Sequence, residues 1–182
     1  MSRIAAAVGL RQSSLYYYFR RKEDLVAALV AQANIGSLAL AKDIVAAGGS
    51  APSQVYRFVR DDVIALCALP FDINEIHRMA ARDPEGFHAY WEERADIARQ
   101  VAKMLRRGVK DGSLRAVNVG RTALTVLAND EGTQNWYRTG PQGSAGVAPA
   151  KVATELADLV VAGLLAPGHN LETVRSEVAS LT

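Results

Sequence analysis

The first 22 residues carry a dense group of side chains that can bind phosphate groups and the edges of bases. An amide, hydroxyls and phenols follow one another between residues 12 and 18, and three cations come next, at Arg20, Arg21 and Lys22. Amides and hydroxyls at the start of a helix can reach both phosphates and base edges in the major groove of DNA. These residue types therefore point to contact with nucleic acid.

The three cations stand where the sequence predicts the N-terminus of a long helix. The helix dipole disfavours a positive charge there by about 0.3–1 kcal/mol, and Arg21 is not one of the usual N-cap residues. A phosphate bound at this helix end would make the same charges favourable. A poorly capped helix that tolerates the charges is the alternative interpretation.

Charge is distributed unevenly along the chain. Residues 1–22 contain five basic side chains and no acidic one, whereas the remaining residues contain 16 basic and 19 acidic side chains. A basic head on a mildly acidic body is what a phosphate-binding protein needs. A solvated basic surface would give the same distribution.

The sequence predicts an all-α fold of about ten helices, because the alternating pattern of strands is absent and helix-forming residues dominate the long segments. Asn118 and Asn170 are predicted N-caps, Asp72 and Glu75 a capping box, and residues 140–149 a loop. The predicted helices cover about residues 2–8, 13–19, 22–46, 52–69, 73–82, 84–111, 118–138, 150–166 and 171–181.

The length of 182 residues, of which 49% are hydrophobic, suits a small head on a larger body with a sizeable core. We expect a DNA-binding head with its connecting helix over residues 1–46 and a ligand-binding and dimerisation body over residues 47–182. No unbroken run of about 18 apolar residues is present, so no membrane partner is expected. The single cysteine, Cys67, and the absence of a secretory signal pattern favour a cytoplasmic protein.

Two short helices joined by a tight turn that contains glycine are typical of a helix-turn-helix. Gly9 can adopt the left-handed conformation that ends the first helix. Leu15 and Phe19, four residues apart, are predicted to anchor the second helix inward. Because three consecutive tyrosines are unfavourable in water without a partner surface, we expect one of residues 16–18 to pack in the core.

The segments IAAAVGL at residues 4–10, LYYYF at 15–19 and KEDL at 22–25 resemble the signature of the TetR family of transcriptional regulators. Their spacing matches the family without a gap over residues 2–29. The resemblance implies that the short helix 13–19 enters the major groove of double-stranded operator DNA. The residues that align with DNA-contacting positions are Gln12, Ser13, Ser14, Tyr16, Tyr17, Tyr18 and Lys22. The family has a further helix before this motif, which would precede Met1.

The resemblance also implies a homodimer, in which the helices 118–138 and 150–166 form a four-helix bundle with their copies. The helix 150–166 is apolar nearly all round in its C-terminal half, so it must bury two faces. A central core helix would show the same pattern. The predicted interface residues are Val152, Leu156, Leu159, Val160 and Leu164.

A pocket for an unidentified small-molecule effector would lie among the helices between residues 22 and 138. Apolar side chains with a few polar anchors are typical of such a cavity, although such residues are more often simply part of the core. The candidates are Phe58, Cys67, Phe71, Phe87, Tyr90, Trp91, Asn129 and Trp136, together with Met79 and Met104.

These patterns predict a ligand-responsive transcriptional repressor that a small molecule releases from its operator, with the long helix 22–46 as the lever between body and head. The alternative is a helical dimeric module that binds a small molecule or a protein and no longer binds DNA. We expect no enzymatic activity and no cofactor, because the sequence has neither a nucleophile elbow nor a glycine-rich phosphate loop. His88 and Glu92 share a helix face and could bind a metal weakly, but an ordinary surface pair is the simpler interpretation and no metal site is expected.

Overall fold

The computed structural model describes residues 1–137 and 146–181, with residues 31–33 described in their backbone only. Over this part of the chain the fold is all-α, as predicted, with nine helices rather than about ten. The predicted loop at 140–149 lies mostly outside the described residues. The helices are α1 (Ser2–Ala7), α2 (Gln12–Tyr18), α3 (Lys22–Ala47), α4 (Ala51–Ala68), α5 (Ile73–Arg82), α6 (His88–Asp111), α7 (Val119–Tyr137), α8 (Pro149–Leu164) and α9 (Leu171–Ser180).

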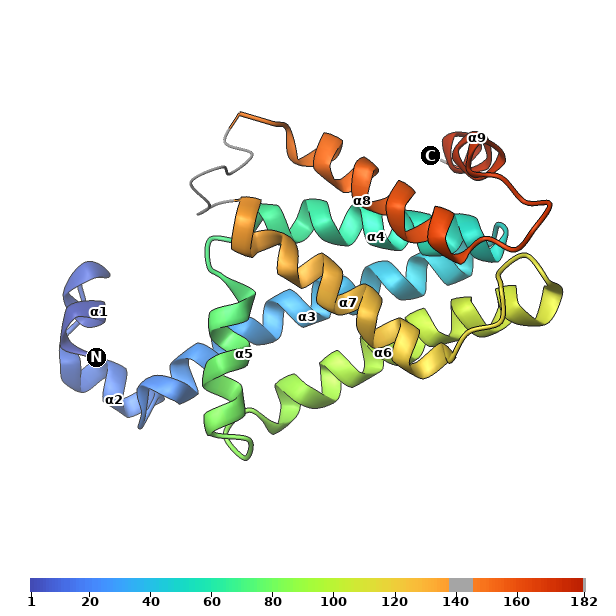
Figure 1. The fold of residues 1–182 in the computed structure, drawn as a ribbon. Helices are drawn as coiled ribbons and strands as arrows, with labels where there is room; N and C mark the ends of the chain where they lie inside the picture. The colour runs from blue at the N-terminus through green and yellow to red at the C-terminus, as the bar shows by residue number, and fades with distance from the viewer. Residues whose placement is uncertain (138–145, 182) are drawn as a thin grey trace.

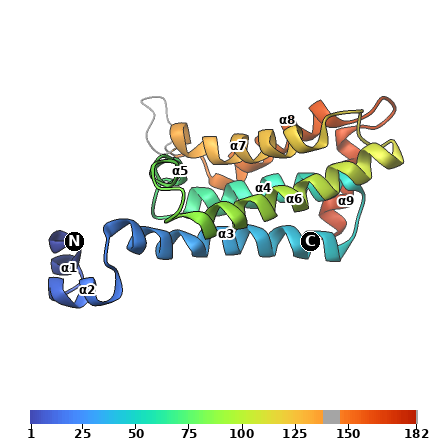
Figure 2. The same ribbon diagram turned by 90° about the horizontal axis from the view of Figure 1, so that it is seen from below.

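The helices form a small head and a larger body that share one long helix (Figures 1 and 2). Helices α1 and α2 make the head at one end, and α3 leads from it along the length of the body. In the body, α4 is central and packs against α3, α6, α7, α8 and α9, while α3 also packs against α6. Because α3 belongs to both parts, a domain boundary at residue 46 stays a prediction.

Side-chain caps fix several helix ends at the positions that the sequence predicts. Asn118 Oδ1 accepts a hydrogen bond from the backbone NH of Arg121 (3.0 Å), and Asn170 Oδ1 accepts one from Thr173 (2.9 Å). These bonds satisfy backbone donors that have no partner inside the helix. In the head, Gly9 has a φ of +69°, which is the left-handed conformation expected after α1.

Two expected features of the α5 and α6 ends are wrong. Asp72 does cap α5, since its Oδ1 accepts from the backbone NH of Asn74 (2.8 Å), but Glu75 forms an ion pair with Arg78 instead of reaching back to complete a capping box. Helix α6 begins at His88 rather than near residue 84. The side chain of Asp83 accepts from the NH of Gly86 (3.1 Å) and holds the intervening residues in a turn.

The body contains two hydrophobic clusters, and each of them packs a different set of helix segments together. The larger one joins α3, α4, α6, α7, α8 and α9, and includes the fully buried Phe58, Val101 and Leu105. The smaller one lies toward the head and joins α3, α4, α5 and the start of α6 through residues such as Val30, Leu66 and Tyr90. Burial of such side chains is the main source of stability. The smaller cluster therefore holds the part of α3 that continues into the head.

Helix α3 is long and apolar enough to cross a membrane by length and composition alone. Lys42 and several polar residues interrupt its apolar run, so the sequence contains no unbroken apolar stretch at this place. In the structure α3 packs against α4, α5 and α6, with 20% of its apolar stretch buried.

Gly108 in α6 gives a test of this packing. A methyl group at Gly108 would lie 2.6 Å from the buried side chain of Leu114 and 3.0 Å from that of Ala51. We expect Gly108→Ala to lower the free energy of unfolding by about 1–3 kcal/mol through overpacking. Gly120→Ala in α7, where a methyl group meets only Asn118 at 3.7 Å, is the control and should be neutral or slightly stabilising. Urea unfolding of both variants is the measurement, and equal stability would contradict the packing.

Candidate functional site

The outer surface of α2 carries three tyrosines that the rest of the chain leaves exposed. Tyr16, Tyr17 and Tyr18 have 45%, 82% and 74% of their surface accessible, so the expectation that one of them packs in the core is wrong. The inner side of α2 is held instead by Leu15, which is buried as predicted. The rings of Tyr17 and Tyr18 meet edge to face, with centroids 5.1 Å apart. Exposed aromatic rings with phenol groups suit a surface that is covered by a partner.

The structure brings the predicted DNA-contacting residues to one end of the molecule. Gln12 and Ser13 are exposed and Ser14 is half-buried in the first turn of α2, and Lys22 is exposed at the start of α3. Gln12, Ser13 and Ser14 follow the turn between α1 and α2, whereas the tyrosines and Lys22 flank the turn between α2 and α3. The head therefore presents amide, hydroxyl, phenol and ammonium groups side by side, although contact with DNA stays a prediction.

Arg21 has a structural partner, which corrects the interpretation of the basic run. Its backbone NH donates to Asp24 Oδ2 (2.9 Å), and its guanidinium donates to Asp24 Oδ1 and, across to the α5–α6 turn, to Asp83 Oδ2 (2.9 Å). The hydrogen bond from the Arg21 backbone lowers the pKa of Asp24. Acidic Asp24 and Glu23 also supply the negative charge that a helix N-terminus favours. No phosphate is needed to explain Arg21, whereas Lys22 and Arg20 have no ion pair within the described residues.

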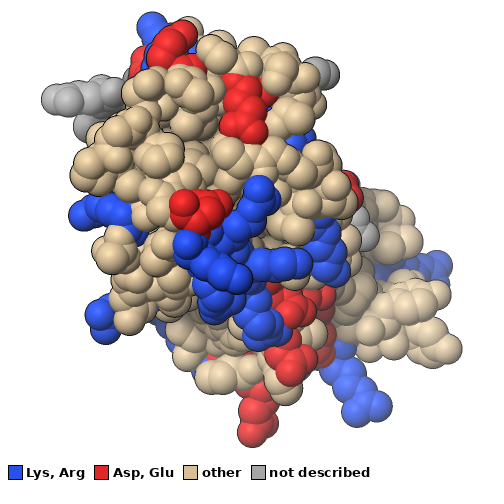
Figure 3. All heavy atoms as spheres, turned by 90° about the vertical axis from the view of Figure 1, so that its right-hand side faces the viewer, with Lys and Arg blue, Asp and Glu red and all other residues tan. Residues whose placement is uncertain are grey.

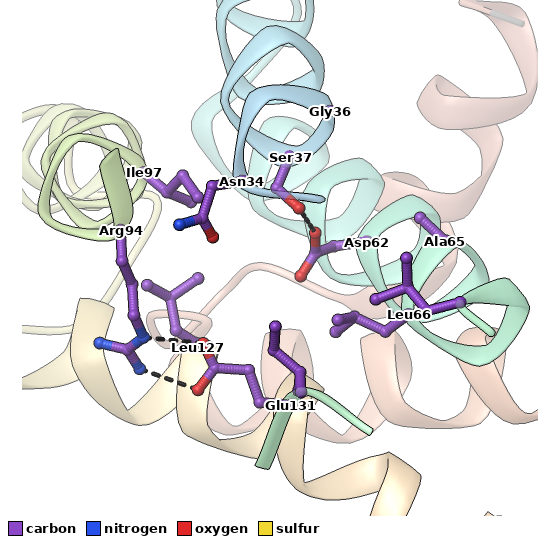
Figure 4. Close-up of a pocket in the computed structure, with 12 residues that line it drawn as sticks. Asn34, Gly36, Ser37, Asp62, Ala65, Leu66, Arg94, Ile97, Leu127 and Glu131 are labelled. Atoms are coloured by element: carbon purple, nitrogen blue, oxygen red, sulfur yellow. Dashed lines mark hydrogen bonds and ion pairs between the residues drawn. The ribbon is translucent and has the colours of Figure 1, made fainter. Parts of the chain in front are cut away.

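A cavity of about 180 Å³ lies inside the body, between α3, α4, α6 and α7 (Figure 4). Its apolar wall comes from residues such as Leu66, Ile97 and Leu127. Its polar groups include the carboxyl group of Asp62, which points into the space between the helices. The lining residues are Asn34, Gly36, Ser37, Asp62, Ala65, Leu66, Leu69, Ile73, Arg94, Ile97, Leu127 and Glu131.

Some charged groups around the cavity form ion pairs, whereas others have no group of opposite charge beside them among the described residues. Arg94 donates two hydrogen bonds to Glu131 (2.9 and 2.8 Å). Asp62 accepts one from the Ser37 hydroxyl (2.6 Å), and burial raises its pKa to about 6. Next to the cavity, burial and the charge of Asp62 raise the pKa of Asp130 well above its ordinary value, and its Oδ2 has no partner within the described chain. Buried carboxyl groups without a cation are unfavourable and are often found at functional sites.

None of the predicted ligand-binding residues lines this cavity. Phe58, Cys67, Phe87 and Tyr90 are buried in the two hydrophobic clusters. Phe71 and Trp91 pack at the edge of the smaller cluster. Asn129 faces a separate groove between α7 and α8, and Trp136 is exposed. Met79 packs against the smaller cluster and Met104 lies in the larger one. Their role in ligand binding stays a prediction.

The predicted interface residues of α8 lie on different sides of the helix. Val152 and Leu164 are buried in the chain's own core, and Leu156 and Val160 are half-buried against it. Leu159 is 69% exposed. The C-terminal half of the helix therefore has a second apolar face, on which Leu159 is exposed, and the burial of this face against a partner stays a prediction.

The structure places no metal-binding group in the parts of the chain that it describes. No cluster of three or more His, Cys, Asp or Glu side chains there is arranged to hold a metal ion. His88 and Glu92 lie 3.8 Å apart on the surface of α6, which is the geometry of an exposed ion pair.

Comparison with known proteins identifies the architecture of head and body. The model for bacterial regulatory proteins of the tetR family matches residues 1–29, and the model for the tetracyclin repressor-like C-terminal domain matches residues 75–164. Together they span more than half of the chain. The chain belongs to the TetR family. No curated protein sequence matches it.

Solved structures of other TetR-family proteins show the same fold at low sequence identity. The regulator PfmR from Thermus thermophilus has a TM-score of 0.75 at 23% identity, over 88% of this chain and 86% of that one. The ketosteroid regulator KstR2 of Mycobacterium tuberculosis has a TM-score of 0.72 at 18% identity, over 90% and 83%. AmtR of Mycobacterium smegmatis has a TM-score of 0.72 at 21% identity, over 98% and 82%. The TetR family consists of DNA-binding regulators, so the protein is a DNA-binding transcriptional regulator and not an enzyme.

Sequence reasoning missed the polar residues of the cavity, although a signal for them is present. In this TetR-family protein, Asp62 follows Val59 at helical spacing and adjoins Val63, so it falls on the apolar face of α4. Asp130 stands likewise four residues after Val126 on the buried face of α7. A carboxylate on a buried helix face is rare unless it is paired or functional. The predicted pocket residues are mainly aromatic side chains, and neither Asp62 nor Asp130 is among them.

Basic side chains also gather on the end of the body opposite the head (Figure 3). The C-terminal part of α6, which reaches this end in Figure 1, contributes the exposed Arg106, Arg107 and Lys110. The body is therefore acidic only as an average. Both the head and this end of the body are basic, so charge alone does not identify the DNA-binding surface. The tyrosines that are exposed in the described part of the chain are found only on the head.

The buried carboxyl group of Asp62 predicts a dependence of stability on pH. Because its folded pKa of about 6 lies above that of the unfolded chain, the folded state binds a proton more tightly between these values. Stability should fall as the pH rises through this window and stay lower above it. We expect Asp62→Asn, whose amide oxygen can still accept from Ser37, to raise the free energy of unfolding by about 1–3 kcal/mol near neutral pH and by much less near pH 4.

Urea unfolding at the two pH values measures this effect. Asp61→Asn is the matched control, because Asp61 is the neighbouring carboxylate but is paired with Arg60 (2.7 Å) at the surface. A loss of stability in Asp62→Asn at neutral pH would contradict the assignment.

Proposed function

We propose that this regulator is a cytoplasmic homodimer that represses transcription by binding operator DNA through α2, and that a small molecule in the body cavity releases it. The main support for α2 as the DNA-binding helix is that Tyr16, Tyr17 and Tyr18 are exposed on it, while Leu15 anchors its other side. A helix of this kind fits the major groove, and the polar side chains at its start can reach base edges.

The two heads of a dimer would contact successive major grooves, about 34–36 Å apart. Lys22 would add a phosphate contact at the start of α3, next to the recognition helix. Such contacts fix the position of the helix on the duplex, while the side chains of α2 select the sequence.

The outer faces of α7 and α8 are the surface proposed for dimerisation. Leu124 and Leu159 are large apolar side chains exposed on these two helices. A mainly apolar groove between the helices is lined by residues that include Val126, Val160 and Gly163. Exposed apolar groups on adjacent helices favour burial against a second subunit.

The proposed link between effector and DNA runs along α3. Asn34 and Ser37 of α3 line the cavity, and the same helix begins at the head. The ion pair of Arg21 with Asp83 ties that beginning to the turn before α6, a helix that also contributes to the cavity wall. A ligand that favours one arrangement of these helices would change the spacing of the heads, with a coupling free energy of about 1–3 kcal/mol.

DNA binding can be tested with the full-length protein and its own upstream DNA in a mobility-shift titration. We expect Lys22→Ala to weaken binding of all sequences and to reduce the salt dependence by about one counterion per subunit. Tyr17→Ala should weaken specific binding as well. Lys110→Ala, on the far end of the body, is the control and should bind as the wild type does. A folded dimer that binds no DNA at low salt would favour the alternative of a module that binds only a small molecule or protein.

The dimer surface can be tested by changing one exposed leucine. We expect Leu159→Glu to shift the protein from dimer to monomer in sedimentation velocity, because the charge would be buried without a partner in the interface. Ile35→Glu on α3 is the control, since Ile35 is exposed to a similar degree but lies on a helix outside this surface. Dissociation by Ile35→Glu and not by Leu159→Glu would place the interface elsewhere.

A further inference from the structure

We propose that the body cavity binds a small organic cation, a protonated amine with a compact apolar body, whose ammonium group pairs with Asp62. This inference rests on the proposed function, because it names the chemical class of the effector that the cavity takes.

Two acceptor oxygens of the cavity accept no hydrogen bond from the described residues. Asp62 is only 3% exposed, and its Oδ1 is occupied by the Ser37 hydroxyl, while no described residue hydrogen-bonds to its Oδ2. Asn34 donates from Nδ2 to the backbone carbonyl of Tyr90 (3.0 Å), which leaves its own carbonyl oxygen as an acceptor. A ligand that donates hydrogen bonds would satisfy both groups.

The cation that lines the cavity is already paired. Arg94 holds Glu131 with two hydrogen bonds, and its guanidinium turns toward that carboxylate rather than toward Asp62 (Figure 4). His77 of α5 lies 3.7 Å from Glu131, but burial lowers the pKa of its imidazole. At and beside the cavity, the described residues therefore supply one guanidinium, that of Arg94, and three carboxyl groups, those of Asp62, Asp130 and Glu131.

This balance of charge selects among ligand classes. An organic cation would neutralise Asp62 and would also lower the repulsion that Asp62 exerts on Asp130. An anionic ligand would meet the carboxyl groups without a free cation, and a neutral ligand would leave the Asp62 charge uncompensated. The electrostatics of the cavity therefore favour a cation.

The size and walls of the cavity restrict the apolar part of the ligand. Its volume of about 180 Å³ is slightly larger than a cavity of about 150 Å³ that holds benzene. Leu66, Leu69, Ile97 and Leu127 would surround one ring or a short alkyl chain. Benzylammonium and butylammonium are suitable probes.

Calorimetric titration of the full-length protein near pH 7.5 tests the proposal. We expect both ammonium ions to bind more tightly than benzyl alcohol and benzoate. Asp62→Asn should weaken the binding of the ammonium ions by about tenfold or more, because it removes the buried charge. Asp61→Asn is the control and should leave their affinity unchanged, since Asp61 is paired with Arg60 and does not line the cavity. Affinity should also increase as the pH rises through about 6, where Asp62 ionises.

Absence of binding by both ammonium ions, or equal binding by the wild type and Asp62→Asn, would overturn the proposal. A mobility-shift assay with operator DNA separates it from the proposed function. If an ammonium ion binds through Asp62 but leaves the protein–DNA complex intact, the cation site stands and the effector role of the cavity falls.

Discussion

The structure depends on one unbroken helix that is shared between head and body. Helix α3 has 26 residues, which corresponds to a length of about 39 Å at 1.5 Å per residue. Its N-terminus is fixed by the Arg21, Asp24 and Asp83 contacts, and its middle and end are packed against α4 and α6. Sharp kinks in helices occur at proline, at Gly/Ser pairs, at bulges or where a group is inserted, and α3 continues as one helix across its own Gly36-Ser37 pair. The direction in which α3 leaves the body therefore sets where the head stands.

Buried polar groups in the body fall into two kinds. The side-chain amide of Gln134 has hydrogen-bond partners for both of its polar atoms. Its Oε1 accepts from the NH of Ile73 (2.7 Å), and its Nε2 donates to the carbonyl groups of Phe71 (3.3 Å) and Leu66. A satisfied group of this kind fixes one packing arrangement. The carboxyl groups of Asp62 and Asp130 are instead partly satisfied, which lowers stability. Groups that lower stability at the edge of a cavity are consistent with a binding role.

The fold was largely predictable because its signals are local. The caps at Asn118 and Asn170, the left-handed Gly9 and the inward-facing Leu15 each depend on a few neighbouring residues, and the structure has all of them. The errors come from contacts distant in sequence. Arg21 is neutralised partly by Asp83, 62 residues away, and all three head tyrosines are exposed because nothing from the body reaches them.

The sequence by itself determined the all-α class, the head motif and the apolar character of the outer face of α8. Periodicity and capping act within one helix, so they can be recognised without knowing what the helix packs against. Only the tertiary structure decided where the cavity lies. The large aromatic residues filled the two hydrophobic clusters, because close packing places bulky apolar side chains in the core. The cavity opened instead beside Asn34, Ser37 and Asp62, where polar side chains from α3 and α4 meet and no large side chain fills the space.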